Sequence, residues 1–515
     1  MTLLRAGIQT SVYQERVIAA AGIGRTGEPV NNGILAPSGT GIPAGPPVRK
    51  ARSVQRFILI PLIVACALFM ENMDSTVIAT SLPAIALDIG ESPIALKLAL
   101  TSYLVALAVF IPISGWVADK IGARTVFATA IVVFMGGSLL CALSGSLAAF
   151  VAARFLQGIG GAMMVPVGRL VLLRTAPKSE LVSALNYLTL PALIGPIIGP
   201  PLGGLLTLYL SWHWIFLINI PIGAFGLIMV LRHIPNVREP EVPALDVRGF
   251  FLLGVGLSVL MLGLSAIGGH LISNGIAIAC VVVGALGIVA YVLHARRVPH
   301  PLITLDLLKF PTFHTGVVAG SLFRIGVGAT PFLLPLLLQL GFGLDPFQSG
   351  LITCATAGGA MFMKTLTVYI LKRFGFRPVL MVNAVFASAS VAVCGLFTAE
   401  TSHVLIVVIL LASGCVRSLQ FTSLSAISFA EISRSAMSQA SSVSSMAQRV
   451  TQSLGIVVGA FALEISSSLQ GHDSVVAADF GPAFFAMGLL AVSSMLFHRR
   501  LADDAGSEVS GHRKP

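Results

Sequence analysis

The chain has 515 residues, of which 56% are hydrophobic and 10% are charged, and its mean hydropathy is +0.92. A soluble globular domain carries about 25% charged residues, so this composition excludes a water-soluble protein and indicates one embedded in a lipid bilayer. The formal net charge is +11, but the basic residues lie in short segments between long apolar runs. This placement argues against a nucleic-acid-binding protein.

Residues 1–56 differ in composition from the rest of the chain. They are rich in glycine, proline, serine and threonine, and they end in the basic cluster Arg49, Lys50, Arg52 and Arg56. They lack the long apolar core of a cleaved signal peptide. We therefore predict a disordered cytoplasmic tail.

Fourteen apolar runs follow, each about 20 residues or longer, which is the length that a helix needs to cross the ~30 Å hydrocarbon core of a bilayer. The short alternating segments of a membrane β-barrel are absent from the sequence. The predicted fold class is an all-α membrane protein with fourteen transmembrane helices. The predicted spans lie near 57–82, 94–118, 124–144, 147–173, 181–210, 213–232, 249–269, 273–295, 314–340, 348–371, 377–398, 403–429, 438–465 and 477–498.

Lysine and arginine are shared unevenly between the loops on the two sides. If the N-terminus is inside, almost every loop base falls on the cytoplasmic side, as the positive-inside rule requires. The outer loops hold only Lys97 and otherwise carry acids such as Asp88, Glu91 and Glu400. The pattern predicts that both termini are cytoplasmic.

Two loops indicate an internal duplication. Gly122 and Arg124 follow the second span, and Gly375 and Arg377 follow the tenth span at the same relative spacing. Transporters are often built from two related halves. We predict a six-helix bundle over 57–233 and a second six-helix bundle over 311–498. An inserted two-helix hairpin lies between them over 246–297, and a second cytoplasmic tail follows over 499–515.

The first span contains two acids. Glu71 and Asp74 are three residues apart and share a helical face, and ionisable groups at membrane depth are costly enough to suggest a function. Asp74 and Arg154 lie at similar depths, each roughly 12 Å from the outer end of its span. A carboxyl held between burial and a nearby arginine can load and release a proton near neutral pH. Proton coupling through Asp74, Glu71 and Arg154 is one interpretation, and a static ion pair that fixes helix packing is the other.

The loop after the second span combines glycines with opposite charges. Gly115, Asp119, Gly122 and Arg124 form a candidate gating loop, in which Asp119 pairs locally or faces the N-terminus of a helix from the other half. The alternative is a solvated loop that only obeys the positive-inside rule.

The fourth and fifth spans carry unusual packing residues. Met163 and Met164 offer an adaptable apolar surface. The fifth span concentrates glycine and proline, which a membrane helix tolerates as a kinked, closely packed segment. Its candidate residues are Gly195, Pro196, Gly199, Pro200, Gly203 and Gly204.

Several bases lie inside predicted spans, and the second half has no mid-span acid that could pair with them. Arg324, Arg417 and Arg449 sit near mid-span, whereas Arg169 and Lys364 are interpreted as reaching the inner interface by snorkelling. The excess of bases favours a cavity of positive potential, or else many carbonyl partners. With Met163 and Met164, the three mid-span arginines are the candidate cavity residues.

We find no sequence signal for a metal site, a cofactor or an enzyme. The six cysteines have no ligand-type spacing, and no nucleophile–base arrangement is visible. A proton gradient is the only energy source that the candidates imply.

Five stretches in order resemble motifs of the major facilitator superfamily, specifically its fourteen-span drug:proton antiporters of the EmrB/QacA type. The five stretches are 73–83 in the first span, the gating loop 115–124, 154–166 in the fourth span, the glycine–proline run 195–204, and 212–223 at the sixth span. In the first stretch, Asp74 stands at the acidic position of the motif. The resemblance covers about 57–498. One departure is that Lys372 and Arg373 stand in the second gating loop where Asp119 and Lys120 stand in the first.

The resemblance implies a proton-coupled exporter of small molecules in the bacterial inner membrane, of multidrug-resistance type, that works by alternating access. In this prediction, protonation of Asp74, with Glu71, weakens its contact with Arg154, and Asp119 with Arg124 closes the cytoplasmic side. The mid-span arginines favour an alternative, an exporter of anionic metabolites or metal–carboxylate complexes. A membrane receptor or scaffold that does not transport is the second alternative.

Overall fold

The computed structural model describes residues 48–175, 181–239, 242, 244–267, 272–433, 436–472 and 474–512. Its contacts divide the chain into Met1–Ala51 and Arg52–Pro515, and all the candidate membrane spans belong to the second unit. The predicted tail 1–56 therefore lies almost entirely outside the described residues.

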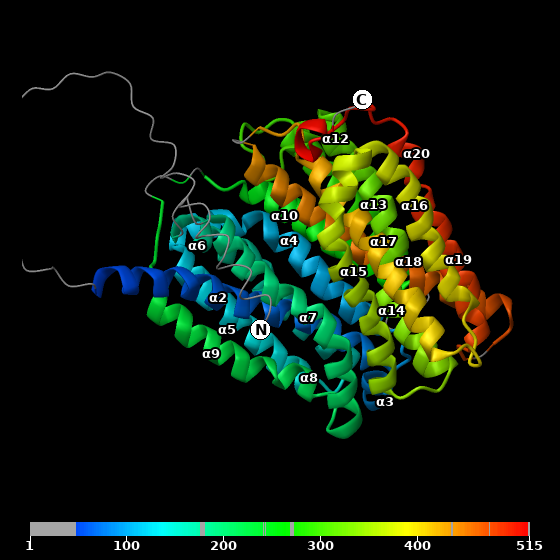
Figure 1. Ribbon diagram of the computed structural model, residues 1–515. Helices are drawn as coiled ribbons and strands as arrows, with labels where there is room; N and C mark the ends of the chain where they lie inside the picture. Colours follow the sequence, from blue (N-terminus) through cyan, green and yellow to red (C-terminus); the bar gives the residue numbers. More distant parts are fainter. Residues whose placement is uncertain are drawn as a thin grey trace, which may run out of the picture. The chain divides into compact units, whose positions relative to one another are not determined.

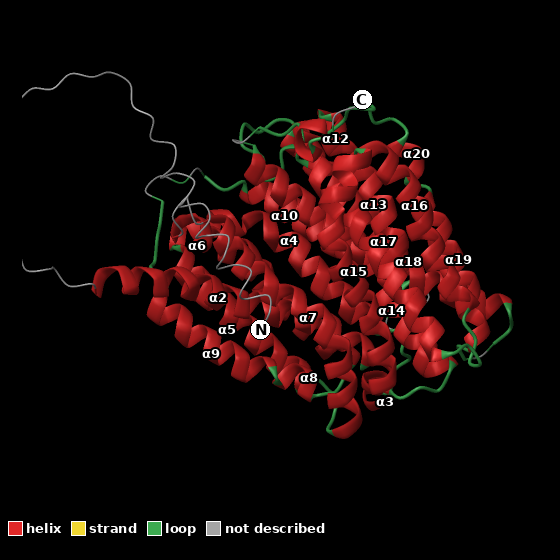
Figure 2. Ribbon diagram, in the orientation of Figure 1, coloured by secondary structure: helices red, strands yellow, loops and turns green. Residues whose placement is uncertain are grey.

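The described residues form helices joined by short loops and contain no strand (Figure 2). Thirteen helical stretches among them are long and apolar enough to cross a membrane. The fifth predicted span corresponds to helix α7. Its apolar part Ile194–Tyr209 is shorter than the thirteen other stretches, so the count of fourteen stays a prediction. The all-α membrane fold is confirmed.

The long helices follow the predicted spans closely, and several of those spans contain short helical pieces. The elements of the first half are α2 (Val48–Val77), η1 (Ile78–Thr80), α3 (Leu82–Ile89), α4 (Lys97–Ile121), α5 (Ala123–Ala142), α6 (Leu147–Thr175), α7 (Leu181–Tyr209), α8 (Trp214–Leu217) and α9 (Asn219–His233). Between the halves lie α10 (Val247–Ala266), α11 (Asn274–Ala295) and η3 (Leu305–Lys309). The second half contains α12 (Pro311–His314), η4 (Thr315–Ala319), α13 (Gly320–Gly328), α14 (Thr330–Leu336), η5 (Leu337–Gly341), α15 (Pro346–Phe374), α16 (Phe376–Val393), η6 (Cys394–Leu396), α17 (His403–Ser428), α18 (Met437–Leu469), α19 (Ala477–Val492), α20 (Met495–His498) and α21 (Ser507–Ser510).

Helix α4 packs on α6 of its own half, on α10 and on α18 of the second half (Figure 1). Helix α15 packs on α17 of its own half and on α7 of the first half. Two helix pairs therefore join the halves, α4 with α18 and α7 with α15.

Helices α10 and α11 correspond to the predicted inserted hairpin and pack tightly against each other. Asp246 begins α10 by accepting a hydrogen bond from the Gly249 amide, and it also accepts one from His294 on α11 at 2.8 Å. Burial opposes the charged form of this carboxyl, but hydrogen bonds from His294, Gly249 and Leu302 together lower the pKa of Asp246. Only 17% of the most apolar stretch of α11 is buried in protein, so this helix presents most of its surface to lipid.

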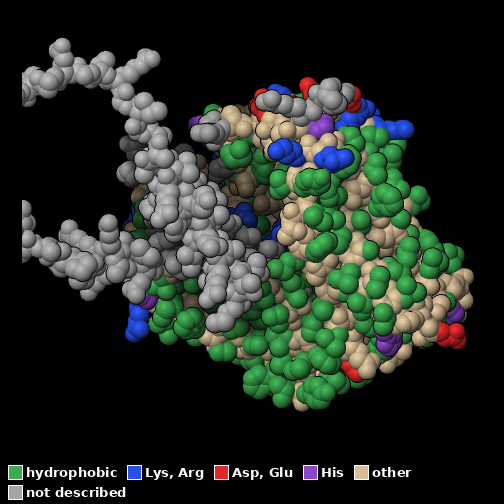
Figure 3. All heavy atoms as spheres, in the orientation of Figure 1, with side chains coloured by type: hydrophobic (Ala, Val, Ile, Leu, Met, Phe, Trp, Pro, Cys, Tyr) green, Lys and Arg blue, Asp and Glu red, His purple; other side chains and the backbone are tan. Residues whose placement is uncertain are grey.

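Hydrophobic side chains cover the visible flank of the second unit, and lysines and arginines gather at the end where the C-terminus lies (Figure 3). This distribution suits a body that is surrounded by hydrocarbon and meets water at its ends. Which end faces the cytoplasm stays a prediction.

The two halves touch where α2 passes into η1. The Gln339 side-chain amide donates to the Thr80 carbonyl oxygen at 2.9 Å, and the Thr80 hydroxyl donates to the Pro200 carbonyl oxygen at 3.3 Å. A Cβ added to Gly204 would collide with the Pro346 backbone, and one added to Gly350 would collide with the Pro200 backbone. Small residues thus bring the backbones of α7 and α15 together at this end.

Candidate functional site

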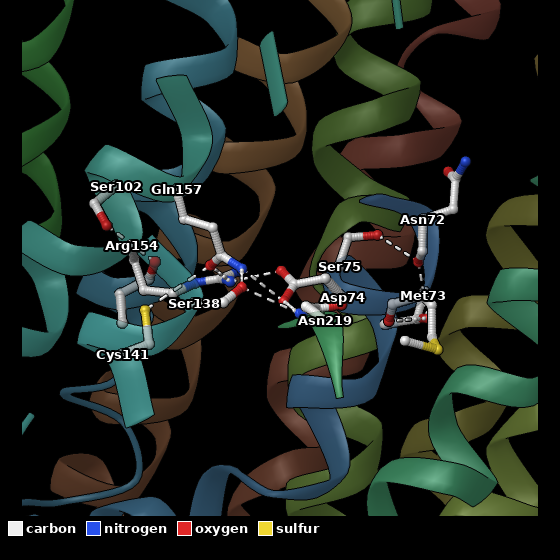
Figure 4. Close-up of polar contacts among 12 residues, drawn as sticks. Asn72, Met73, Asp74, Ser75, Ser102, Ser138, Cys141, Arg154, Gln157 and Asn219 are labelled. Atoms are coloured by element: carbon white, nitrogen blue, oxygen red, sulfur yellow. Dashed lines mark hydrogen bonds and ion pairs between the residues drawn. The ribbon is translucent and has the colours of Figure 1, made fainter. Parts of the chain in front are cut away.

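Asp74 lies at the centre of a buried polar network between α2, α5, α6 and α9 (Figure 4). Its carboxylate accepts hydrogen bonds from Arg154 at 2.7 Å, Gln157 at 2.8 Å and Asn219 at 2.9 Å. Gln157 and Asn219 also donate to the Ser138 hydroxyl. Both members of the Asp74–Arg154 ion pair are almost completely buried, with side-chain exposed fractions of 0% and 1%.

The predicted pair of Asp74 and Arg154 is therefore present, and Asp74 is not among the residues that line the central cavity described below. Successive residues of a helix point about 100° apart. Ser75 and Thr76 line the central cavity described below, whereas Asp74 points into the first half. Arg154, Gln157 and Asn219 donate hydrogen bonds to the Asp74 carboxylate, so both of its oxygens have partners within the first half.

Glu71, unlike Asp74, pairs with a residue of the other half. Its carboxylate accepts from the Arg449 guanidinium of α18 at 3.2 Å. The Glu71 side chain is 2% exposed and that of Arg449 is 26% exposed. An acid of the first half and a base of the second half thus meet inside the membrane-spanning region.

The central cavity has a volume of about 560 Å³ and is lined by both halves. Ser75, Thr76 and Pro200 belong to α2 and α7, and residues of α14, α15, α17 and α18 complete the lining. The cavity begins about one helical turn from the Glu71–Arg449 pair, because Ser75 follows Glu71 by four residues and Gln452 follows Arg449 by three.

Among the described residues that line this cavity, two are basic and none is acidic. Arg417 comes from α17 and Lys364 from α15. The prediction that Arg417 is a cavity residue agrees with its position. Lys364 is exposed and also lines the cavity, and its interpretation as a snorkelling residue stays a prediction. The cavity lining is consequently of one sign.

Four other cavity candidates lie elsewhere. Arg324 is 5% exposed and packs over the Phe421 ring, with its guanidinium carbon 5.9 Å from the ring centroid. Arg449 is engaged by Glu71. Met164 is fully buried and Met163 packs against the main core. None of the four is among the cavity-lining residues, because their helical faces are filled by neighbouring helices.

The gating loop forms different contacts from those predicted. Asp119 pairs with Arg174 at the end of α6, at 2.7 Å, and Arg174 also pairs with Glu239 at 2.7 Å. The predicted Asp119–Arg124 contact is not among the ion pairs of the described residues. The connection after α9 returns over the turn between α4 and α5, and this fold-back supplies Glu239. Gly115 lies in α4 with open space around its Cα.

Gly122 has φ +111° and separates α4 from α5. A Cβ at this position would collide with the Asn236 side chain, and the Ala123 amide donates to the Val237 carbonyl oxygen at 3.2 Å. In the second half, Gly375 has φ +76° and separates α15 from α16, where the His512 ring packs against it. Each turn is thus covered by a segment that follows the last long helix of its half.

The glycine–proline run of α7 faces the first helix of its own half and the second half. A Cβ on Gly195 would lie 3.1 Å from the Met73 amide nitrogen, and Cβ atoms on Gly199 and Gly203 would collide with Thr76 and the Val77 carbonyl oxygen. Pro196 and Pro200 line the central cavity. The run therefore serves close backbone packing on one side and the cavity wall on the other.

A further ion pair between the halves was not predicted. Lys97 at the start of α4 is 2% exposed and donates to Glu464 of α18 at 2.7 Å. The sequence shows an outer-loop lysine and an acid near a span end, but it contains no signal that places them together. Gln157, Asn219 and Arg174 were missed for the same reason.

Comparisons with known proteins agree with this architecture. The family model described as Major Facilitator Superfamily matches residues 64–293 and 316–514. The chain is 37% identical over 455 residues to the "Putative multidrug resistance protein MdtD" of Escherichia coli (strain K12 / DH10B), which covers 88% of this chain and 96% of the relative.

Solved structures show the same fold at low sequence identity. A D-xylose–proton symporter has a TM-score of 0.61 at 14% identity, covering 87% of this chain and 98% of that one. The nucleoside transporter NupG has a TM-score of 0.59 at 16% identity, covering 87% of this chain and 100% of that one. These relatives are transporters and not enzymes. The chain is a multi-pass membrane protein that belongs to the Major Facilitator Superfamily of transporters.

Proposed function

We propose that this transporter is a proton-coupled exporter of small molecules that works by alternating access. The observation that carries the proposal is the Glu71–Arg449 ion pair, because it joins the two halves beside the central cavity. Family membership and the name of the relative in Escherichia coli support export. The glycine–proline run of α7, which resembles the antiporter motif, also supports it.

Proton binding at Glu71 would convert its carboxylate into a neutral acid. The attraction to Arg449 would then be lost, and Arg449, which is partly exposed, would take up water instead. A ligand shifts a conformational equilibrium only if it binds the two states unequally. A proton meets this condition here, since the charged form of Glu71 favours the state in which the halves touch.

The Asp74–Arg154 pair has a different role in this proposal. It fixes α2 to α6 and α9 through the hydrogen bonds that the two oxygens of Asp74 accept. Because Glu71 lies one helical turn away on α2, a change at Glu71 would move this braced set of helices together. The proposed proton carrier is thus Glu71, in place of the predicted Asp74.

The proposal includes a location in the bacterial inner membrane with both termini in the cytoplasm. Support comes from the lysines and arginines gathered at the end where the C-terminus lies (Figure 3). Labelling of single cysteines from either side of intact cells tests this topology, and labelling of a C-terminal cysteine from outside would contradict it.

The coupling is tested by Glu71→Gln in inverted membrane vesicles that are acidified inside by respiration. For any compound in a panel of organic cations and anions that accumulates in a gradient-dependent way, the variant should lose that accumulation. Exchange of the same compound without a gradient should continue. Asp306→Asn is the matched control, because it neutralises an exposed carboxylate that pairs only locally with Lys309. Gradient-driven accumulation at the wild-type rate in Glu71→Gln would refute the assignment.

A further inference from the structure

The unpaired bases of the central cavity bear on what the transporter carries. Neither Lys364 nor Arg417 has an ion-pair or hydrogen-bond partner among the described residues, and both line the same space. No aspartate or glutamate is among the described residues that line it. Lys364 is exposed and Arg417 is partly buried. A cationic group that is partly removed from water is costly unless a charge or a hydrogen-bond acceptor compensates it.

The packing of α15 against α17 places both bases on one wall. The Ser418 hydroxyl donates to the Ala360 carbonyl oxygen at 2.9 Å. Arg417 is the neighbour of Ser418 in sequence, and Lys364 follows Ala360 by about one helical turn. A Cβ on Gly359 or Gly414 would collide with the backbone of the opposite helix, so the two backbones are in close contact here. The bases therefore come from neighbouring positions on two tightly packed helices.

A second observation also points to a ligand with hydrogen-bond acceptors. The Thr330 hydroxyl is buried without a partner, and the residue, which is 4% exposed, lines the cavity. Buried polar groups usually have a partner. An acceptor on a bound molecule would supply the missing hydrogen bond.

The remaining wall combines hydroxyl groups with an apolar part. Pro200 of α7, Pro331 and Leu334 of α14 and Phe421 of α17 form the apolar part. The guanidinium carbon of Arg324 lies 5.9 Å from the Phe421 ring centroid, and Arg324 is not among the lining residues. The volume of about 560 Å³ is typical of sites for small molecules.

We infer that the cavity binds an amphipathic organic anion, whose negative group lies between Arg417 and Lys364 and whose apolar body lies against Phe421 and the prolines. The inference rests on the proposed transport function and specifies its substrate class. The two acids of α2 do not compensate these bases, since Asp74 is bound by Arg154 and Glu71 by Arg449. A cationic ligand would meet two like charges in a site of low dielectric.

The experiment compares two probes that share one apolar body, 2-naphthoate and 2-naphthamidine. Equilibrium dialysis with the purified full-length protein measures both affinities at one pH and without a gradient. We expect 2-naphthoate to bind at least about tenfold more tightly than 2-naphthamidine, since a hydrogen bond to a charged group is worth at least that factor. Equal affinities, tighter binding of the amidine, or no measurable binding of the naphthoate would overturn the inference.

Variants locate the site. Arg417→Gln and Lys364→Gln should each weaken naphthoate binding by about tenfold. Lys309→Gln, at an exposed surface position, should leave naphthoate binding unchanged. Monodisperse elution and an unchanged thermal midpoint verify that each variant is folded. The comparison of the two probes on the wild-type protein decides the charge preference even if one variant fails to fold.

The same assay separates this inference from the proposed coupling. Glu71→Gln protein should bind 2-naphthoate with the wild-type affinity, whether or not it has lost gradient-driven transport. Unchanged naphthoate binding in both cavity variants would refute the site while leaving the coupling proposal intact.

Discussion

The two halves of the transporter distribute their buried charges differently. In the first half, the mid-helix acids Glu71 and Asp74 each have a basic partner, at 3.2 and 2.7 Å. In the second half, Arg324, Lys364 and Arg417 have no acidic partner among the described residues. The two acids of α2 therefore have partners within the protein, and the second half leaves positive charge at the cavity.

This asymmetry separates two tasks that symmetric halves would share. Ion pairs that are complete within one half fix its helices, and a pair that joins the halves can control their separation. Unpaired bases at a cavity wall remain available to a ligand. The charge difference thus explains how related halves of one fold can bind protons and substrate at different places.

The largest effect that tests the comparison should come from breaking the pair within the first half. Asp74→Asn leaves Arg154 with a side-chain exposed fraction of 1% and without a countercharge, so the folded state should lose about 3–5 kcal/mol. Glu71→Gln should cost less, because Arg449 is partly exposed. Thermal unfolding and the yield of monodisperse protein in detergent measure both losses. Equal losses would show that the two pairs have the same structural role.

A smaller effect should follow from disturbing the contact between the halves. Gly204→Ala places a methyl group against the Pro346 backbone, which should destabilise the touching state by about 1–3 kcal/mol. We expect slower cross-linking between cysteines placed across the α7–α15 contact, and slower transport in vesicles. Gly226→Ala in α9 is the matched control, because a Cβ there meets nothing within 4 Å. Similar behaviour of the two variants would mean that this contact does not control the halves.

The smallest effects concern the covered turns. Arg174→Gln removes the contacts to Asp119 and Glu239 in the first half, and Arg377→Gln removes the contact to Asp503 in the second. These charges are partly exposed, so each change should cost less than about 1 kcal/mol. Arg174→Gln should cost more, since Arg174 is the less exposed base and holds two acids. Stability curves of both variants at low and high salt measure the difference, and a larger loss in Arg377→Gln would reverse the expected order.

The sequence was sufficient for the fold because a bilayer leaves few choices for the backbone. Long apolar runs must form helices, since every backbone polar group needs an internal partner in hydrocarbon. The Asp74–Arg154 pair was predictable from two depths along two spans. The direction in which Asp74 points was not, because a turn of about 100° between neighbouring residues decides whether a side chain faces the cavity or its own bundle.

Contacts between distant segments were beyond prediction from one sequence. The partner of Glu71 is Arg449, far along the chain, and nothing near Glu71 indicates it. Lys364 was interpreted as a snorkelling residue, and the sequence contains no signal that the packing of α15 on α17 also places it at the cavity. Asp119 meets Arg174 because the chain after α9 folds back over the neighbouring turn, and loop charges alone do not determine such a path.

The segment that covers the turn at Gly375 has a practical consequence for handling the protein. Asp503 pairs with Arg377, and the His512 ring nitrogen Nδ1 donates a hydrogen bond to the Lys372 carbonyl oxygen at 3.0 Å. Shortened versions that stop near residue 500 would uncover this turn and remove both attachments. Purification tags are therefore better separated from residue 512 by a flexible spacer, so that the segment stays packed on the turn between α15 and α16.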